Sequence, residues 1–154
     1  MTQKITPFLW FDNNAKEAAE FYVSVFKDAK IKSSSILRDT PSGNVENLTM
    51  ELFGQEFALI SGGPLFKFNE SISFVVHCET QEEVDYYWEK LSADPKAEQC
   101  GWLKDKFGLS WQIVPKALGE LMGDKDPVKS KRVMEAMLKM KKIDIGLLEQ
   151  AHGG

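Results

Sequence analysis

The amino-acid sequence predicts an α+β fold made of two similar βαβββ modules. Three observations support this prediction. A strand-like apolar run followed by an amphipathic helical pattern occurs twice along the 154 residues. Shifting the chain by 66 positions places the predicted helix start at Asn14 on that at Thr80. A second shift, by 54 positions, places the hairpin that begins at Phe53 on the one that begins at Phe107, so a duplicated module is favoured.

The first half has the pattern of a strand, a helix and three more strands. Residues 5–11 form an apolar run that Asp12, Asn13 and Asn14 end, because these side chains prefer turns and helix caps. The apolar face of the following helix contains Ala15, Ala18, Ala19, Tyr22, Val25 and Phe26. Three further strands are predicted at residues 31–37, 46–53 and 56–60, with turn signals at 40–43 and 54–55.

The second half repeats this order less regularly. Residues 71–78 form a strand-like run, and Thr80 to Glu83 has the Thr-x-x-Glu form of a capping box. The helix that follows has the apolar face Val84, Tyr87, Trp88 and Leu91. Residues 99–107 and 109–114 predict two more strands, with a short additional strand possible between Trp102 and Lys106.

The remaining residues predict helices. Residues 117–122 form one or two helical turns, and Asp126-Pro127 begins a helix that extends to about Lys142. We interpret the seven basic residues between Asp124 and Lys142 as a solvated face above an apolar docking stripe. The domain organisation expected is one domain, with module 1 at about 1–64, module 2 at about 70–115 and a C-terminal helical extension at about 116–154.

Composition excludes several classes of function. A net charge of −4 and a pI near 5.3 provide no positive field for a phosphate backbone, so a nucleic-acid partner is not expected. Residues 1–10 lack a secretory pattern and no run of 18 apolar residues occurs, which predicts no membrane partner and a cytoplasmic location. Two cysteines and two histidines are too few for a disulfide scaffold or a His-rich metal site.

Two motifs resemble a known family. Residues 100–115, Cys-Gly-Trp-Leu-Lys-Asp-Lys-Phe-Gly-Leu-Ser-Trp-Gln-Ile-Val-Pro, are similar to the signature stretch of PhnB-like proteins. Residues 6–11, Thr-Pro-Phe-Leu-Trp-Phe, with Asn14-Ala15 and Phe21-Tyr22, resemble their opening motif. PhnB-like proteins belong to the vicinal oxygen chelate (glyoxalase/bleomycin resistance/dioxygenase) superfamily. The resemblance implies a curved, cup-shaped mixed sheet, often in a homodimer. It continues through Lys129, Arg132, Ala136-Met137 and residues 141–144, and so covers nearly the whole chain.

Members of this group are often labelled 3-demethylubiquinone-9 3-methyltransferase. A Rossmann-like methyltransferase holds S-adenosylmethionine on a glycine-rich turn after its first strand, because only glycine lets the backbone approach the ligand closely. The corresponding turn is Asp12-Asn13-Asn14, without glycine. The sequence therefore disfavours the activity that the label implies, and we expect no cofactor.

The superfamily resemblance also implies positions for metal ligands. Members usually hold a divalent metal with His and Glu side chains, two from each half. In this sequence the implied positions are Thr6 or Pro7, Ala58, Ser73 (Ser71 if the register slips), and Gln112. Because none is a charged or imidazole ligand, we expect no catalytic metal.

Strand alternation predicts which residues face the cup. If Gln112 faces it, Ser110 and Val114 lie beside it and Trp111 belongs to the core. The same parity places Ser73 and His77 in the cup. The ligand-binding residues we predict are Gln112, Ser73, Ser110, Phe8, Trp10, Trp102 and Lys104, although the aromatic side chains, Phe8 and Trp10 above all, could equally be core.

Two residues are weak catalytic candidates. His77 could accept a proton near the rim, but a lone histidine at a strand end is more often structural or exposed. Cys100 could act as a nucleophile, but it lacks an evident base partner and could be a small apolar filler.

The leading hypothesis is a metal-independent protein that binds an unidentified small molecule in an apolar cup, or a cryptic enzyme. A metal-dependent lyase, isomerase or dioxygenase that uses substitutes such as Gln112 and His77 is the alternative from the enzyme class. A third hypothesis is a dimeric scaffold whose aromatic and Met-rich surfaces serve assembly.

Overall fold

The computed structural model describes residues 2–154, which form two compact units. The first unit ends at Phe68, and the second extends from Asn69 to Gly154. Each unit packs helices on a mixed β-sheet, so the α+β class predicted from the sequence is confirmed. Each helix among these residues is too short or too polar to span a lipid bilayer.

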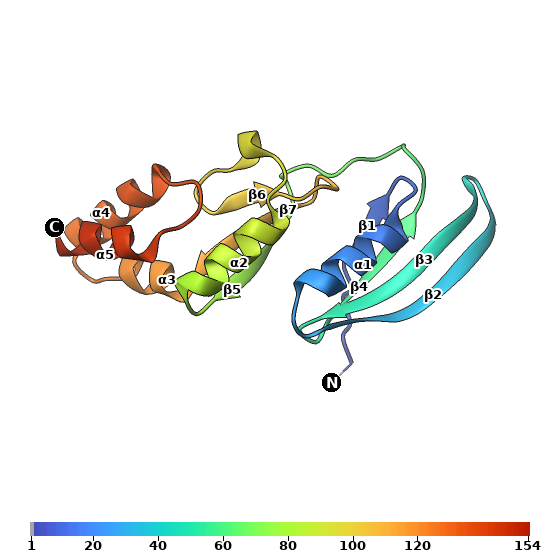
Figure 1. Ribbon diagram of the computed structural model, residues 1–154, viewed down its shortest axis with the longest axis horizontal. Helices are drawn as coiled ribbons and strands as arrows, with labels where there is room; N and C mark the ends of the chain where they lie inside the picture. The colour runs from blue at the N-terminus through green and yellow to red at the C-terminus, as the bar shows by residue number, and fades with distance from the viewer. Residues whose placement is uncertain (1) are drawn as a thin grey trace. The chain divides into compact units, whose positions relative to one another are not determined.

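The first unit has the predicted βαβββ order (Figure 1). Its elements are β1 (Phe8–Phe11), α1 (Ala15–Val25), β2 (Ala29–Thr40), β3 (Gly43–Leu52) and β4 (Gln55–Ser61). The strand order is β1-β4-β3-β2, with β1 parallel to β4 and the other pairs antiparallel. Helix α1 covers one face of this sheet, against buried side chains such as Leu9, Leu48 and Leu59.

The start of α1 differs in detail from the prediction. The helix begins at Ala15, directly after the Asp12–Asn14 turn, but Asn14 makes no side-chain cap hydrogen bond. The backbone N–H of Ala15 instead donates to the hydroxyl of Ser61, at 3.0 Å, on the end of β4. A cap supplied from another strand was not visible in the local sequence pattern.

The second unit repeats this plan with one strand fewer. Its sheet elements are β5 (Ser73–Cys78), α2 (Gln81–Leu91), the 3-10 helix η1 (Pro95–Ala97), β6 (Trp102–Lys104) and β7 (Ser110–Pro115), in the order β5-β7-β6. Helices α1 and α2 are both 11 residues long and start 66 residues apart, as the predicted duplication requires. Thr80 caps α2 by accepting from the backbone of Glu83.

The fourth strand of the second βαβββ module is not formed within residues 69–154. The chain between α2 and β6 passes through η1, whose first residue, Pro95, lacks the N–H that a strand ladder uses. The predicted strand at 99–107 is correspondingly reduced to β6. By their places in the two sheets, β5, β7 and β6 correspond to β1, β4 and β3, and residues 69–154 form no counterpart of β2.

The C-terminal helices are α3 (Lys116–Met122), α4 (Pro127–Leu138) and α5 (Ile145–Gly153). They enclose a core of Leu118, Val133, Ile143 and Leu148. The predicted helix to about Lys142 ends at Leu138, because Met140 and Lys141 use their carbonyls to accept hydrogen bonds from Cys100 and Gly101. Helix α5 lies within the helical extension predicted at about 116–154, but its bounds as a separate helix were not predicted.

The turn between β6 and β7 is built around a buried carboxylate. Asp105 is 3% exposed, and its Oδ1 accepts from the backbone N–H groups of Phe107 and Leu109, at 2.9 and 3.1 Å. Its Oδ2 accepts from the indole Nε1 of Trp111, at 2.9 Å. One side chain thus satisfies two turn donors and a core aromatic donor, which fixes the β6–β7 hairpin.

We predict that Asp105→Ala destabilises the protein by about 2–4 kcal/mol, because it leaves buried donors without an acceptor. Urea unfolding measures this change. Asp126→Ala, which removes the acceptor of the hydrogen bond donated by the Val128 N–H at the start of α4, is the matched control with an expected cost of about 1 kcal/mol. Equal losses in the two variants would contradict a special role for Asp105.

Candidate functional site

The sheet of the second unit has one buried and one open face. Trp111, Ile113 and Val76 are at most 9% exposed and belong to the core on the α2 side. Gln112 and Ser73 alternate with them and are only half-buried on the other face. This parity is the one predicted from the sequence.

A polar row crosses the open face over three strands. Ser73 pairs with Ser110, and Ser110 pairs with Lys104, which places their side chains next to one another. The amide Nε2 of Gln112 donates to the hydroxyl of Ser73, at 2.9 Å. The hydroxyl of Ser110 is buried, in a residue only 1% exposed, and makes no hydrogen bond within the described chain. A buried hydroxyl without a partner is costly, so its environment calls for a ligand or water.

A second row is more apolar. Gln112 lies between Val75 on β5 and Trp102 on β6. His77 pairs with Val114 one step further along and is exposed. The structure therefore places His77 at the end of the open face, away from the polar row.

Cys100 lies in a tight turn before β6. Cys100 and Gly101 have φ of 51° and 86°, and the N–H of Trp102 donates to the carbonyl of Gln99, at 2.8 Å, as in a type I′ turn. Cysteine rarely adopts a positive φ. The turn is stabilised because the N–H groups of Cys100 and Gly101 donate to Met140 and Lys141, at 2.8 and 2.7 Å. A side chain at Gly101 would contact Ile143 and the carbonyl of Ile113 at 3.2 Å.

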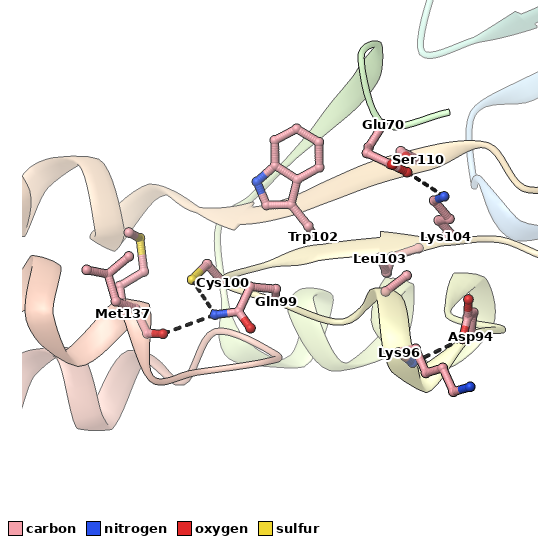
Figure 2. Close-up of a pocket in the computed structure, with 12 residues that line it drawn as sticks. Glu70, Asp94, Lys96, Gln99, Cys100, Trp102, Leu103, Lys104, Ser110 and Met137 are labelled. Atoms are coloured by element: carbon pink, nitrogen blue, oxygen red, sulfur yellow. Dashed lines mark hydrogen bonds and ion pairs between the residues drawn. The ribbon is translucent and has the colours of Figure 1, made fainter. Parts of the chain in front are cut away.

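These features surround a pocket of about 770 Å³ (Figure 2). The pocket brings together four residues predicted from the sequence, namely Cys100, Trp102, Lys104 and Ser110. Its other lining residues are Glu70, Asp94, Lys96, Ala97, Gln99, Leu103, Met137 and Leu138. Met137 and Leu138 belong to the apolar docking stripe that we predicted from the sequence. This stripe predicted that the two residues pack against another surface, but it did not predict that they line a pocket.

Two of the charged groups that line the pocket form an ion pair. Lys104 Nζ forms an ion pair with Glu70 Oε2, and the hydrogen bond and charge of Lys104 lower the pKa of Glu70. The side chain of Lys104 is 28% exposed and that of Glu70 67%. Asp94 accepts from the backbone N–H of Lys96, at 3.0 Å. The half-buried side chain of Lys104 is thus paired with the Glu70 side chain, which is largely exposed to water.

Phe8 and Trp10 lie in the first unit, on the open face of its sheet, and are not among the residues that line this pocket. Phe8 is 60% exposed. Trp10 is half-buried, donates from its indole to the carbonyl of Gly63 at 2.9 Å, and packs edge to face on Phe66. These two aromatic residues thus belong to the first unit, whereas all the residues that line this pocket belong to the second.

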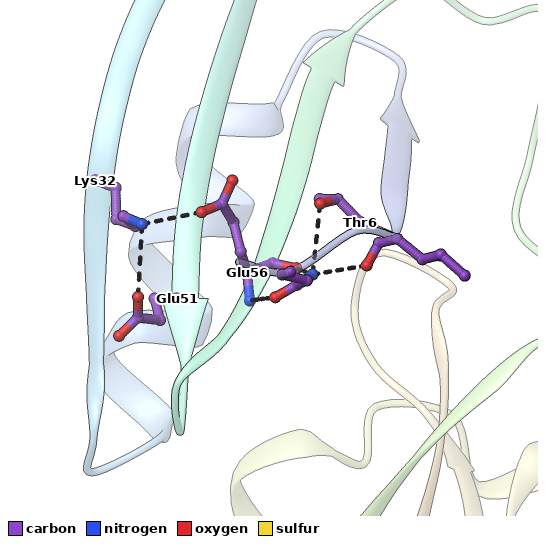
Figure 3. Close-up of polar contacts among 6 residues, drawn as sticks. Thr6, Lys32, Glu51 and Glu56 are labelled. Carbon is purple, nitrogen blue, oxygen red and sulfur yellow. Dashed lines mark hydrogen bonds and ion pairs between the residues drawn. The ribbon is translucent and has the colours of Figure 1, made fainter. Parts of the chain in front are cut away.

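The implied metal-ligand positions do not fit a divalent cation. Gln112 and Ser73 satisfy each other, and Ala58 has no donor atom. Thr6 accepts a long hydrogen bond from Gln3, at 3.4 Å. The carboxylates near Ala58, those of Glu51 and Glu56, both contact Lys32, at 3.7 and 2.9 Å (Figure 3). Within residues 2–154 there is also no group of three His, Cys, Asp or Glu side chains with metal-site geometry.

Comparison with solved structures defines the class of protein. A protein from Pseudomonas aeruginosa is similar with a TM-score of 0.58 and 14% identity, covering 74% of this chain and 98% of that one. The fosfomycin resistance protein FosX from Listeria monocytogenes has a TM-score of 0.53 and 15% identity, covering 78% and 96%. At these identities the likeness shows the fold alone, which is the vicinal oxygen chelate fold.

The particular family follows from closer similarity. A family model described as 3-demethylubiquinone-9 3-methyltransferase matches residues 3–114. A Bacillus cereus PhnB protein, described as a putative 3-demethylubiquinone-9 3-methyltransferase, is 36% identical with a TM-score of 0.61, covering 73% of this chain and 99% of that one. The chain therefore belongs to this PhnB-like family. No curated protein matches it.

The family match ends before α3, so the resemblance we extended to residues 129–144 is not part of it. Met137 and Leu138, which form one wall of the pocket, lie outside the matched residues. The pocket is thus made jointly by the family module and the C-terminal helices.

We predict that iodoacetamide alkylates Cys100 in the folded protein and leaves Cys78 intact. Cys100 is half-buried in the pocket, whereas Cys78 is 2% exposed and its burial raises the pKa of its thiol to about 12. Peptide mass spectrometry after brief treatment near neutral pH distinguishes the two sites. The Cys100→Ser variant should remain unmodified until it is unfolded, and rapid labelling of Cys78 in that variant would contradict the prediction.

We also predict a stability loss at high pH that depends on Cys78. Its folded pKa of about 12 lies above the reference value of 9.0, so the neutral thiol stabilises the folded state fully below about pH 9 and progressively less toward pH 12. Unfolding free energies between about pH 8 and about pH 11 should fall more steeply in the natural chain than in Cys78→Ala. Parallel curves for the two proteins would refute the assignment.

Proposed function

We propose that this PhnB-like protein binds a small organic molecule, without a catalytic metal, in the pocket between β6, η1 and α4. The observation that carries this proposal is the pocket itself, with a volume in the range of small-molecule sites and a buried, unpartnered hydroxyl at Ser110. Homodimerisation and a cytoplasmic location stay predictions from the sequence.

The lining residues support recognition by shape and a few hydrogen bonds. The half-buried ring of Trp102, with Met137 and Leu138, offers an apolar surface for a planar or branched group. Ser110 can donate and accept, and the thiol of Cys100 accepts from Gln99 at 3.1 Å. Among residues 2–154 the hydrogen-bond partner of the Cys100 sulfur is the amide of Gln99 and not a base, which supports binding over nucleophilic catalysis.

The donor chemistry supports metal independence. One solved FosX structure, from Listeria monocytogenes, is described as a complex with Mn(II) and a dihydroxypropylphosphonic acid. In this chain the implied ligand positions are Thr6 or Pro7, Ala58, Ser73 and Gln112, without an anionic donor to offset a divalent charge. Lys32, between Glu51 and Glu56, would repel a cation at the nearest carboxylates.

The methyl-transfer activity in the family description has less support. The turn after β1 contains Asp12, Asn13 and Asn14, whose side chains prevent the close backbone approach of a glycine-rich cofactor turn. The proposed function therefore does not include S-adenosylmethionine.

The experiment is a fluorescence titration with the neutral, polarity-sensitive probe N-phenyl-1-naphthylamine, together with elemental analysis of the purified protein. We expect saturable binding that Trp102→Ala weakens by about tenfold, because the aromatic wall is lost. EDTA treatment and added Mn²⁺, Ni²⁺ or Zn²⁺ should change neither the probe affinity nor the melting temperature.

Phe8→Ala, which removes an exposed aromatic side chain from the first unit, is the matched control and should leave binding unchanged. Stoichiometric metal whose removal abolishes binding would overturn metal independence and favour the lyase, isomerase or dioxygenase alternative. Calorimetric binding of S-adenosylmethionine would favour the methyltransferase. No saturable probe binding would refute the proposed function.

A further inference from the structure

We propose that the ligand of this pocket is an organic anion with an apolar body, whose charged group binds between Lys104 and Ser110 and whose body lies along Trp102 toward α4. This inference rests on the proposed function and adds the chemical class of the ligand.

The polar end of the pocket is suited to an anion. Lys104 and Ser110 are cross-strand partners, so their side chains are neighbours on the open face. The hydroxyl of Ser110 is buried without a hydrogen-bond partner among the described residues, and the side chain of Lys104 is only 28% exposed. An ammonium and a free hydroxyl together can donate two hydrogen bonds to one anionic group, which would satisfy Ser110.

Glu70 indicates how an anion is held there. Its carboxylate contacts Lys104 Nζ, while 67% of its side chain is exposed (Figure 2). An ion pair with so exposed a partner contributes little to stability, because water solvates the released carboxylate. A ligand anion that also reaches Ser110 can therefore replace Glu70 at Lys104. Glu70 acts in this view as an internal competitor for the site.

The other charged groups do not provide an equivalent position. Lys96 lies on η1 and is exposed, and Asp94 already accepts from the Lys96 backbone. Glu70 and Asp94 offset the two lysines, so the anion preference depends on the displacement of Glu70. This makes Glu70 the most informative residue to change.

The opposite end of the pocket is suited to an apolar body. Trp102 precedes Lys104 by one alternation on the same face of β6, and the Cys100 turn precedes Trp102. The extended chain from Trp102 to Lys104 spans roughly 7 Å, so the indole lies within reach of a ligand whose anionic group is at Lys104. Met137 and Leu138 of α4 line the pocket beyond Trp102. A flat or branched apolar group of one to two rings would cover this surface.

The experiment compares two probes with the same body. The anion 8-anilinonaphthalene-1-sulfonate and neutral N-phenyl-1-naphthylamine share the anilinonaphthalene skeleton and differ in the sulfonate. We expect Lys104→Met to lower the ratio of anionic-probe affinity to neutral-probe affinity by about tenfold and Glu70→Gln to raise this ratio several-fold. Ser110→Ala should lower the ratio as well.

Lys131→Met is the matched control, because Lys131 forms an exposed pair with Glu135 on α4 and does not line the pocket. If the neutral probe binds but Lys104→Met and Glu70→Gln leave the affinity for the anionic probe unchanged, the inference is overturned while the proposed function stands. If neither probe binds, the proposed function fails as well. Dependence of the anionic probe on Phe8→Ala instead of Trp102→Ala would place it in the first unit and overturn the inference.

Discussion

The hydrogen bonds of the Asp105 carboxylate are the interaction on which the candidate site depends most. They close the turn between β6 and β7 and join it to the indole of Trp111 in the core. The register that results pairs Lys104 with Ser110 and Trp102 with Gln112. A shift of one residue in this hairpin would turn the side chains of one strand, those of Lys104 and Trp102 or those of Ser110 and Gln112, to the opposite face.

A second constraint comes from the chain between α4 and α5. Its carbonyls at Met140 and Lys141 hold the Cys100–Gly101 turn, and Leu138 accepts from the side chain of Gln99, at 3.1 Å. On the other side, Gln81 of α2 donates to Ile143 and accepts from Ile145, at 3.0 and 2.8 Å, while Lys142 pairs with Asp85. The C-terminal helices are therefore attached to the family module at two places, and α4 is held where it can line the pocket.

On the open face of this sheet, the positions that the superfamily resemblance assigns to metal ligands hold uncharged groups. Gln112 and Ser73 form a neutral hydrogen bond where the family resemblance implies Glu and His. The buried hydroxyl without a hydrogen-bond partner among the described residues is that of Ser110. Ser110 pairs with Lys104, next to the Gln112–Trp102 pair. The function that we propose, recognition of an organic group, uses Ser110 and Lys104 and no metal ligand.

The sequence by itself determined the α+β class, the duplicated order of elements, both main helices and the inward parity of β5 and β7. These features depend on local periodicity and on caps such as Thr80, which adjacent residues decide. It also named Cys100, Trp102, Lys104 and Ser110, because they lie in one motif whose strand alternation is readable.

Only the tertiary structure decided the rest. Several features depend on contacts between segments far apart in the chain. They are the cap of α1 by Ser61, the formation of η1 in place of a strand, the end of α4 at Leu138, and the place of Glu70, Met137 and Leu138 in the pocket. Asp105 was part of the recognised motif, yet its role required the positions of three donors to be known. The local sequence pattern predicts which face of a helix or strand a side chain lies on. The hydrogen-bond partner of a buried polar group instead depends on how elements far apart in the sequence pack together.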